Sequence, residues 1–198
     1  MSLPEQLPRI VLGSTSRYRA DLLRRLIPHF EQVAPATDEA PLPDEEPRAR
    51  ALRLAIAKAE AVAQLCPGAL VIGSDQVAAL GDLVLDKPGS VERACAQLAA
   101  SSGREVDFHT ALCVIDTRHH RQYTHLDLTR VCFRQLQPDA ICRYVEREQP
   151  LDCAGSFKCE GLGISLFDRI DNQDPSALIG LPLIALARLL REAGVTVP

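Results

Sequence analysis

Short apolar runs alternate with amphipathic stretches through the first hundred residues of the chain. Residues 9–12 and 69–72 are runs rich in Leu, Val and Ile, which is typical of strands buried on both faces of a sheet. The leucines of residues 22–26 share one face of a helix, and a longer apolar stripe runs through residues 52–63. This alternation of strands and helices predicts an α/β fold.

The second half of the chain indicates a long antiparallel pair followed by shorter elements. Residues 105–116 and 122–135 are predicted to be long strands, joined by a polar tip. Gly81 predicts a hairpin turn, and Asp44 and Ser90 are the expected N-caps of two helices. We expect helices at residues 44–66, 90–100, 138–147 and 181–192, short strands at 30–34 and 162–167, and polar loops at 35–46 and 168–176.

Neither a repeat nor a dividing linker interrupts these elements. We therefore expect a single α/β domain over residues 1–198, with a mixed sheet flanked by helices and a cleft between two lobes. The net charge of -4 and the aromatic content of 4% disfavour nucleic acid as a partner. No apolar run is long enough for a bilayer, and no signal peptide is apparent. The seven Cys are scattered without a CxxC, which favours a reducing, cytoplasmic setting.

Asp75 follows closely after the apolar run at residues 69–72. A carboxylate inside a buried strand needs a partner or a metal, so we expect the strand to stop at Gly73-Ser74 and to present Asp75 at its carboxyl end. Ligands of α/β proteins gather outside the carboxyl ends of strands. On position alone, a turn aspartate that caps its own loop is an equal alternative.

A second candidate group lies where the first strand meets a helix. Ser14 and Ser16 are capping residues ahead of that helix, and Arg19 adds positive charge. Backbone N–H groups and the helix dipole make such a junction suitable for an anion. For this piece alone, a capped helix with a solvated basic turn is the default alternative.

Three further charged side chains have two interpretations each. Glu39 follows the second predicted strand, although most acidic loops are merely solvated. Lys58 lies among Ala-rich turns and either reaches into a site or, more simply, extends its amine to water. Pro88 favours an extended backbone at Lys87, which either projects into a site from a rigid loop or is an ordinary loop lysine.

A glycine-rich stretch at residues 151–163 breaks the regular pattern. Its glycines indicate sharp turns or a close approach of the backbone. Lys158 and Glu160 are its charged side chains and therefore its candidates for a chemical role. Together with the carboxylates, the cations and the helix N-terminus described above, they are the groups that a metal-assisted reaction of phosphates needs. Mg²⁺ takes one or two carboxylates and otherwise binds water and substrate phosphates.

Five segments in order resemble the Maf family of nucleotide pyrophosphatases, which were first associated with inhibition of septum formation. Each motif is weak alone, but five in register are specific; one departure is Arg17, where the family usually has Pro. The resemblance implies an elongated mixed-sheet fold, hydrolysis of a nucleoside triphosphate to the monophosphate and pyrophosphate, and a divalent metal, Mg²⁺ or Mn²⁺. The segments are Ser14-Thr15-Ser16-Arg17-Tyr18-Arg19, Asp38-Glu39, Gly73-Ser74-Asp75-Gln76, Lys87-Pro88 and Ala154-Gly155-Ser156-Phe157-Lys158.

The same resemblance implies roles for particular residues. Asp75 would be the general base or a metal carboxylate, and Glu39 would join it at the metal. Gln76 and Glu160 are similar to the 7-methyl-GTP branch of the family, with Tyr18 as a third specificity residue, whereas the dTTP/UTP branch carries Thr and Gln at the first two places. The residues that would hold the phosphates are Ser14, Ser16, Arg19, Lys58 and Lys87.

The expected activity is hydrolysis of 7-methyl-GTP to 7-methyl-GMP and diphosphate, a house-cleaning role against modified nucleotides. One alternative is a dTTP/UTP pyrophosphatase of the same family. Another is a non-enzymatic regulator of cell division. That function would not explain the cations and carboxylates found at the ends of the predicted strands and in the loops. A P-loop enzyme is excluded because no G-x-x-x-x-G-K-[ST] motif occurs. The expected partner is a small nucleotide rather than nucleic acid or a membrane, and a homodimer is among the oligomeric states left open.

Overall fold

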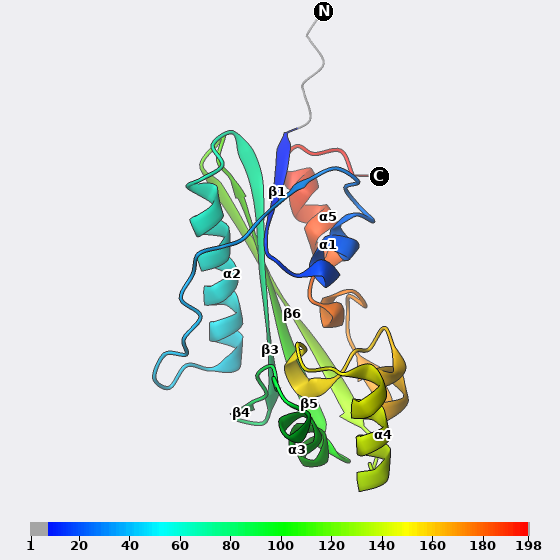
Figure 1. The fold of residues 1–198 in the computed structure, drawn as a ribbon. Coiled ribbons are helices and arrows are strands. Elements are labelled where there is room, and N and C mark those ends of the chain that lie inside the picture. Colours follow the sequence, from blue (N-terminus) through cyan, green and yellow to red (C-terminus); the bar gives the residue numbers. More distant parts are fainter. Residues whose placement is uncertain (1–7, 198) are drawn as a thin grey trace, which may run out of the picture.

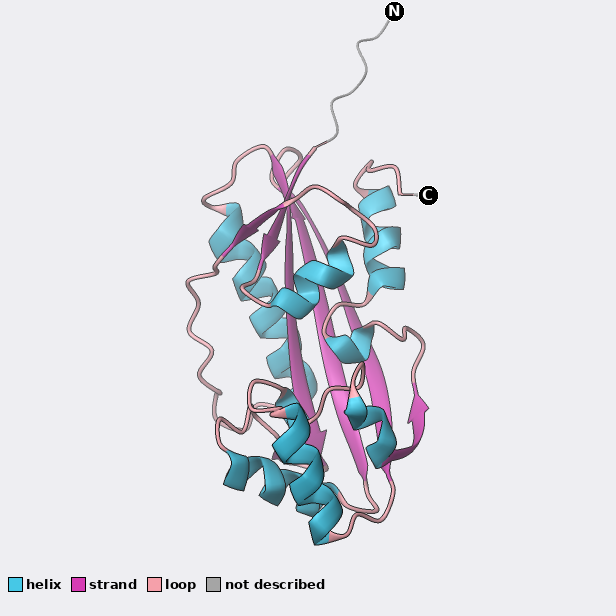
Figure 2. Cartoon of the chain, turned by 45° about the vertical axis from the view of Figure 1, so that its right-hand side comes forward, coloured by secondary structure: helices cyan, strands magenta, loops and turns pink. Residues whose placement is uncertain are grey.

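Within residues 8–197, seven strands form one mixed sheet in the order β2-β1-β3-β5-β6-β7, with β4 paired to β3 (Figures 1 and 2). The computed structural model describes residues 8–197. β1 pairs in parallel with β2 and β3, and the other neighbours are antiparallel. The strands are β1 (Arg9–Gly13), β2 (Glu31–Val33), β3 (Ala69–Leu80), β4 (Leu83–Val84), β5 (Glu105–Asp116), β6 (Arg121–Phe133) and β7 (Phe167–Asp171).

Helices cover both faces of this sheet, so the expected α/β architecture with a mixed sheet is confirmed. Figure 1 shows α2 along one side of the long strands, α1 and α5 on the other side, and α3 and α4 towards the far end. No helix of residues 8–197 is long and apolar enough to cross a membrane. The helices are α1 (Arg17–Leu23), α2 (Pro47–Ala63), α3 (Val91–Ser101), α4 (Pro138–Glu148) and α5 (Leu183–Glu192).

Two large hydrophobic cores lie along the sheet, one towards each end. Leu12, Leu112 and Leu186 belong to the core under α1 and α5. Phe108 and Leu98 belong to the core under α3 and α4. The long strands β3 and β5 contribute side chains to both cores, which makes the sheet the common support of the two lobes.

β3 runs on to Leu80, so the prediction that this strand stops at Gly73-Ser74 is wrong. What ends there is β1, whose last pair with β3 is Gly13 with Gly73. β5 continues along the other edge of β3 and keeps it extended, with Asp75 opposite Ala111. On the β1 side, the strand pairs recorded among residues 8–197 resume only with β4, at Ala79. Asp75 therefore lies within a strand, beside an open stretch of sheet edge.

Several predicted boundaries agree with the structure. The hairpin at Gly81 is present, with Leu80 paired to Leu83. The long strands at β5 and β6 pair over their whole length through the hairpin. Ser90 is the N-cap of α3, where its side chain accepts a hydrogen bond from the backbone N–H of Arg93. Local turn and cap chemistry was therefore sufficient to place these boundaries.

Three other predicted boundaries are wrong. The N-cap of α2 is Glu46 rather than Asp44, because Pro47 favours the first helical position while Asp44 has a positive φ of 55°. Residues 162–167 are not a strand, since Leu162–Leu166 form a 3-10 helix, η2. β7 lies in the predicted polar loop after it, because an edge strand paired on one side with β6 keeps much of its surface exposed and polar.

Candidate functional site

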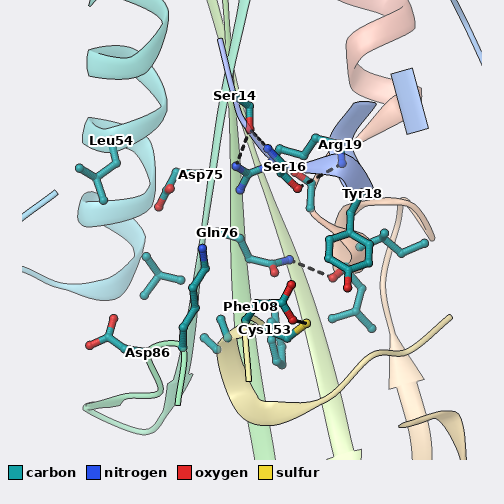
Figure 3. A pocket seen from close by; sticks show the side chains of 18 of the residues that line it. Ser14, Ser16, Tyr18, Arg19, Leu54, Asp75, Gln76, Asp86, Phe108 and Cys153 are labelled. Atoms are coloured by element: carbon teal, nitrogen blue, oxygen red, sulfur yellow. Dashed lines mark hydrogen bonds between the residues drawn. The ribbon is translucent and has the colours of Figure 1, made fainter. Parts of the chain in front are cut away.

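One cavity of about 700 Å³ opens beside β3 and gathers every residue that the sequence singled out for the site (Figure 3). The expected cleft is therefore present and these residues line it, whereas their chemical roles stay predictions. Lys158 of the glycine-rich stretch also lines the cavity. The predicted residues in its wall are Ser14, Ser16, Tyr18, Arg19, Glu39, Lys58, Asp75, Gln76, Lys87 and Glu160.

The cavity reaches both faces of the sheet because it lies over the open edge of β3. Successive side chains of a strand point to opposite faces. Asp75 accordingly contacts Lys58 of α2, while Gln76 contacts residues of the 3-10 helix η3 (Ala177–Ile179) on the opposite face. Neighbouring positions of one strand thus supply two different environments to one cavity.

Lys58 joins two carboxylates at the α2 side of the cavity. Its Nζ lies 2.6 Å from Asp75 Oδ1 and 2.9 Å from Glu39 Oε1, and the residue is 6% exposed. The simpler interpretation, in which Lys58 extends its amine to water, is wrong. Gly73 allows α2 to approach, because a Cβ at this position would lie 2.4 Å from the carbonyl oxygen of Ala55.

The two carboxylates fit a divalent cation that is held jointly with phosphates. Among residues 8–197, no group of three or more His, Cys, Asp and Glu side chains is arranged to hold a metal alone. Glu39 and Asp75 nevertheless converge on one positive charge, the Lys58 ammonium. Mg²⁺ commonly takes only one or two carboxylates and completes its shell with water and substrate phosphates, so this pair is sufficient.

Ser14, Ser16 and Arg19 form a connected group at the start of α1. Ser16 is the N-cap and accepts from the Arg19 backbone N–H, while Ser14 Oγ accepts from the Ser16 N–H at 3.1 Å. The Arg19 Nε donates to the Gly180 carbonyl oxygen at 2.9 Å, which ties the side chain to the far wall. Burial lowers the pKa of Arg19, and the charges of Asp75 and Glu39 oppose that shift.

The Gln76 amide is oriented by its neighbours. Its Nε2 donates to the carbonyl oxygens of Ala177 and Leu178 at 3.0 and 3.1 Å, and to Thr110 Oγ1 at 2.9 Å. Carbonyl oxygens can only accept, so the nitrogen must face them. The donor side of the amide is therefore occupied, and the amide oxygen is the group that Gln76 can offer to a ligand.

Tyr18 lies on the side of the cavity opposite Leu54 of α2 (Figure 3). The Arg17 guanidinium carbon lies 5.0 Å from the centre of the Tyr18 ring, and its Nη2 donates to the Tyr18 hydroxyl at 3.2 Å. This is the geometry of a cation–π contact. The ring therefore already accepts an exposed cation on its face.

Lys158 and Glu160 do not pair with each other. The Lys158 Nζ donates to the carbonyl oxygens of Glu148 and Gln149 at 2.9 and 3.4 Å, at the end of α4. None of the ion pairs found among residues 8–197 involves Glu160. Its exposed carboxylate lines the cavity.

The cysteines of the cavity are unsuited to catalysis. Burial raises the pKa of both Cys153 and Cys159 to about 12. The thiolate is the nucleophilic and metal-binding form of cysteine. Both thiols are therefore protonated near neutral pH and supply neither a nucleophile nor a soft metal ligand.

Sequence reasoning missed Gln97 of α3, which fixes two loops of the cavity. Its Nε2 donates to the Asp86 carbonyl oxygen at 2.9 Å, and its Oε1 accepts from Ser156 Oγ. Gln97 thereby links the loop of Lys87 to the turn before Glu160. Nothing local in the sequence marks this residue, because both of its partners are distant.

Sequence reasoning also missed Arg50, which lines the cavity with Leu54 and Lys58. The recurrence of these residues at four-residue intervals places them on one face of α2, and that signal could have been used.

Comparisons with known proteins agree with this picture. The family model described as Maf-like protein matches residues 9–193. A 7-methyl-GTP pyrophosphatase of Xanthomonas oryzae pv. oryzae (strain MAFF 311018) is 58% identical over 97% of this chain and 100% of its own length. A protein of the same name from Burkholderia pseudomallei (strain 1710b) is 55% identical over 94% of this chain and 88% of its own.

A solved structure shares the architecture at low sequence identity. The structure of a HAM1 protein from Coxiella burnetii aligns with a TM-score of 0.51 and 16% identity, over 94% of this chain and 100% of that chain. At this identity the likeness concerns the fold alone. The family expected from the five segments is confirmed by the family model and by the close relatives: the chain belongs to the Maf family.

Proposed function

We propose that this chain is a nucleoside triphosphate pyrophosphatase that hydrolyses 7-methyl-GTP to 7-methyl-GMP and diphosphate. The observation that carries the proposal is the junction of Asp75, Glu39 and buried Lys58 inside a cavity that also contains Arg19 and Lys87. The names of the close relatives agree with this activity. Hydrolases of this type cleave acid anhydrides, and the cavity holds the charges that such a reaction needs.

Asp75 is the proposed general base. Its carboxylate takes a proton from a water molecule whose oxygen attacks the α-phosphorus of the substrate. The bond from the α-phosphorus to the oxygen that bridges to the β-phosphorus breaks, and diphosphate leaves. Arg19, Lys58 and Lys87 are the proposed phosphate-binding cations, and Ser14 and Ser16 the proposed hydroxyl ligands.

Glu39 and Asp75 are the proposed residues that would hold Mg²⁺ or Mn²⁺. When bound, such an ion would neutralise charge on the phosphate oxygens and polarise them. The Lys58 ammonium lies within ion-pair distance of the same two carboxylates.

Tyr18, Gln76 and Glu160 are the proposed base-recognition residues. Methylation at N7 gives guanine a positive charge, and Glu160 can accept from the N1–H and N2–H edge while complementing that charge. The Gln76 amide oxygen offers a second acceptor. Tyr18 can stack on the charged ring in place of Arg17, a contact worth roughly 0.5–2 kcal/mol.

The cellular role proposed with this activity is removal of modified nucleotides in the cytoplasm. The substrate is a small nucleotide, without nucleic acid or membrane as a partner. The dTTP/UTP activity is disfavoured because Gln76 and Glu160 differ from the residues of that branch. A non-enzymatic regulator of cell division would not need a buried lysine between two carboxylates.

A substrate panel tests the proposal. Release of pyrophosphate from 7-methyl-GTP, GTP, dTTP and UTP is measured with Mg²⁺, with Mn²⁺ and with EDTA. We expect the fastest turnover with 7-methyl-GTP and no turnover in EDTA. Glu160→Gln should reduce the preference for 7-methyl-GTP over GTP, because it removes the negative charge that complements the methylated base. Faster cleavage of dTTP or UTP by the wild-type protein would reject the assigned base-recognition residues.

A further inference from the structure

Arg50 is a cation of the cavity that the proposed mechanism leaves without a role. It shares one face of α2 with Leu54 and Lys58, and all three residues line the cavity. At a rise of 1.5 Å per residue, Arg50 lies about 12 Å from Lys58 along the helix axis. The helix therefore carries a second positive charge along the same wall, away from Asp75.

The Arg50 side chain is partly buried, and its guanidinium is incompletely paired. Its side chain is 14% exposed, and its Nε is buried with no hydrogen-bond partner among residues 8–197. Its Nη2 lies 3.4 Å from Asp86 Oδ1, whereas a charge-assisted hydrogen bond measures about 2.7–2.9 Å. Buried N–H groups are rarely left without acceptors in native proteins. The Nε–Nη2 edge of Arg50 is an exception, because it lacks a close acceptor pair among residues 8–197.

Phosphate is the ligand that fits this edge. A guanidinium presents two parallel N–H groups that match two oxygens of a phosphate, and this pairing is stronger than a neutral hydrogen bond. Lys87 follows Asp86 in sequence and lines the same cavity. Arg50 and Lys87 together therefore supply two cations to one end of the cavity.

The position of Arg50 in the cavity indicates which end of the substrate it would meet. Figure 3 shows Leu54 and Asp86 on one side of the cavity, with Tyr18 on the opposite side. Resting on the proposed function, in which Tyr18 meets the base, the α2 side receives the terminal part of the polyphosphate. We propose that Arg50 binds the terminal phosphate of the nucleoside triphosphate, in the part that leaves as diphosphate.

Asp86 provides a way to separate this proposal from a structural role. Its side chain is 61% exposed, and its ion pair with Arg50 joins α2 to the loop of Lys87. If Arg50 served only to anchor that loop, removing either partner of the pair would have the same effect. If Arg50 binds phosphate, Asp86 competes with the ligand for the guanidinium, and its neutralisation should not weaken binding.

The test is calorimetric titration of inorganic pyrophosphate with Mg²⁺ into the wild-type protein and the variants Arg50→Met, Arg50→Lys and Asp86→Asn. We expect Arg50→Met to weaken binding at least about tenfold, because it removes a charge-assisted donor pair. Arg50→Lys keeps the positive charge but not the two parallel N–H groups, so its affinity for pyrophosphate should fall less than that of Arg50→Met. Asp86→Asn should bind pyrophosphate at least as tightly as the wild type. Titration of 7-methyl-GMP, which lacks the terminal phosphates, should give the same affinity in Arg50→Met and wild type.

Three outcomes would overturn the proposal: no pyrophosphate binding by the wild type, unchanged affinity in Arg50→Met, or an equal loss in Arg50→Met and Asp86→Asn. If Arg50→Met fails to fold, Arg50→Lys decides, and its unchanged affinity would reject the bidentate contact. The titration needs no turnover, so failure of the hydrolysis panel and failure of the Arg50 proposal are distinguishable.

Discussion

Asp75 is a carboxylate inside a strand that is otherwise almost wholly buried. Removing such a group from water is costly unless a counter-charge and hydrogen bonds compensate, and Lys58 provides both at 2.6 Å. Glu39 is more exposed and completes the group from a loop. A buried charged arrangement of this kind is weak evidence for stability, which favours a role in chemistry.

Asp75→Asn keeps the shape of the side chain and removes its charge. Lys58 retains Glu39 as a partner, so we expect the variant to fold with a similar thermal transition. Loss of a general base typically slows a reaction roughly 10²–10⁴-fold, and the turnover of 7-methyl-GTP should fall by that range. A folded variant with near-normal turnover would remove Asp75 from the mechanism.

At the level of single residues, the sequence predicted the charged groups of the cavity but not how they pair. Asp75 stood out because a carboxylate beside an apolar run needs an explanation, and Lys87 because proline restrains it. Lys58 was ambiguous, since the same alanines suit a lysine that faces water or one that faces a carboxylate. Gln97 could not be assigned because its partners are set only by the folded chain, whereas the four-residue spacing of Arg50 and Lys58 on α2 was a usable signal for Arg50.

The approach of α2 to β3 is the contact between elements on which the cavity depends. Gly73 of β3 faces Ala55 and Ala59 of α2 so closely that a Cβ would lie 2.4 Å from the Ala55 carbonyl oxygen and 2.7 Å from the Ala59 nitrogen. This close packing brings Lys58 over the strand to Asp75. The geometry of one ion pair therefore rests on the absence of one methyl group.

Gly73→Ala should push α2 away from the strand. Overpacking of this kind costs about 1–3 kcal/mol of stability, and the displacement of Lys58 should also lower turnover. Gly13→Ala, at the paired position of β1, is a matched control, because a Cβ there meets its nearest atoms at 3.3 Å. Urea unfolding and turnover are measured for both variants, and equal effects would contradict the close contact at Gly73.

Among the elements, the hairpin at Gly81 and the start of α3 were predicted well from local signals, whereas the extent of β3 and the strand β7 were not. Ser90 and Gly81 mark their boundaries through capping and turn geometry. The length of β3 depends instead on β5, which continues alongside after β1 has ended. The prediction of a loop at β7 is wrong because its exposed polar residues acquire a strand conformation only through pairing with β6.

At the scale of the molecule, two large hydrophobic cores of residues 8–197 share one continuous sheet. Leu186 is fully buried in the core under α5, and Leu98 is fully buried in the core under α3. The strands β3 and β5 run through both lobes and pair along their length. Neither lobe can lose its sheet without exposing the core of the other.

We therefore expect a single unfolding transition. Leu98→Ala and Leu186→Ala should each lower the stability of the whole chain by about 2–5 kcal/mol, because each leaves a cavity in a packed core. Hydrogen exchange of β3 amides near Leu70 and near Ala78 should report the same loss in each variant. Separate transitions for the two ends of β3 would show that the lobes unfold independently.

The open edge of β3 has a consequence for how the substrate range of such a protein can diverge. Because Asp75 and Gln76 face opposite sides of the sheet, a substitution at one position leaves the immediate neighbours of the other unchanged. On the proposed function, substitutions at positions 76 and 160 can change which nucleobase is bound, while the residues for hydrolysis on the α2 face stay the same. An engineer who wishes to redirect the protein to another nucleotide has the same freedom.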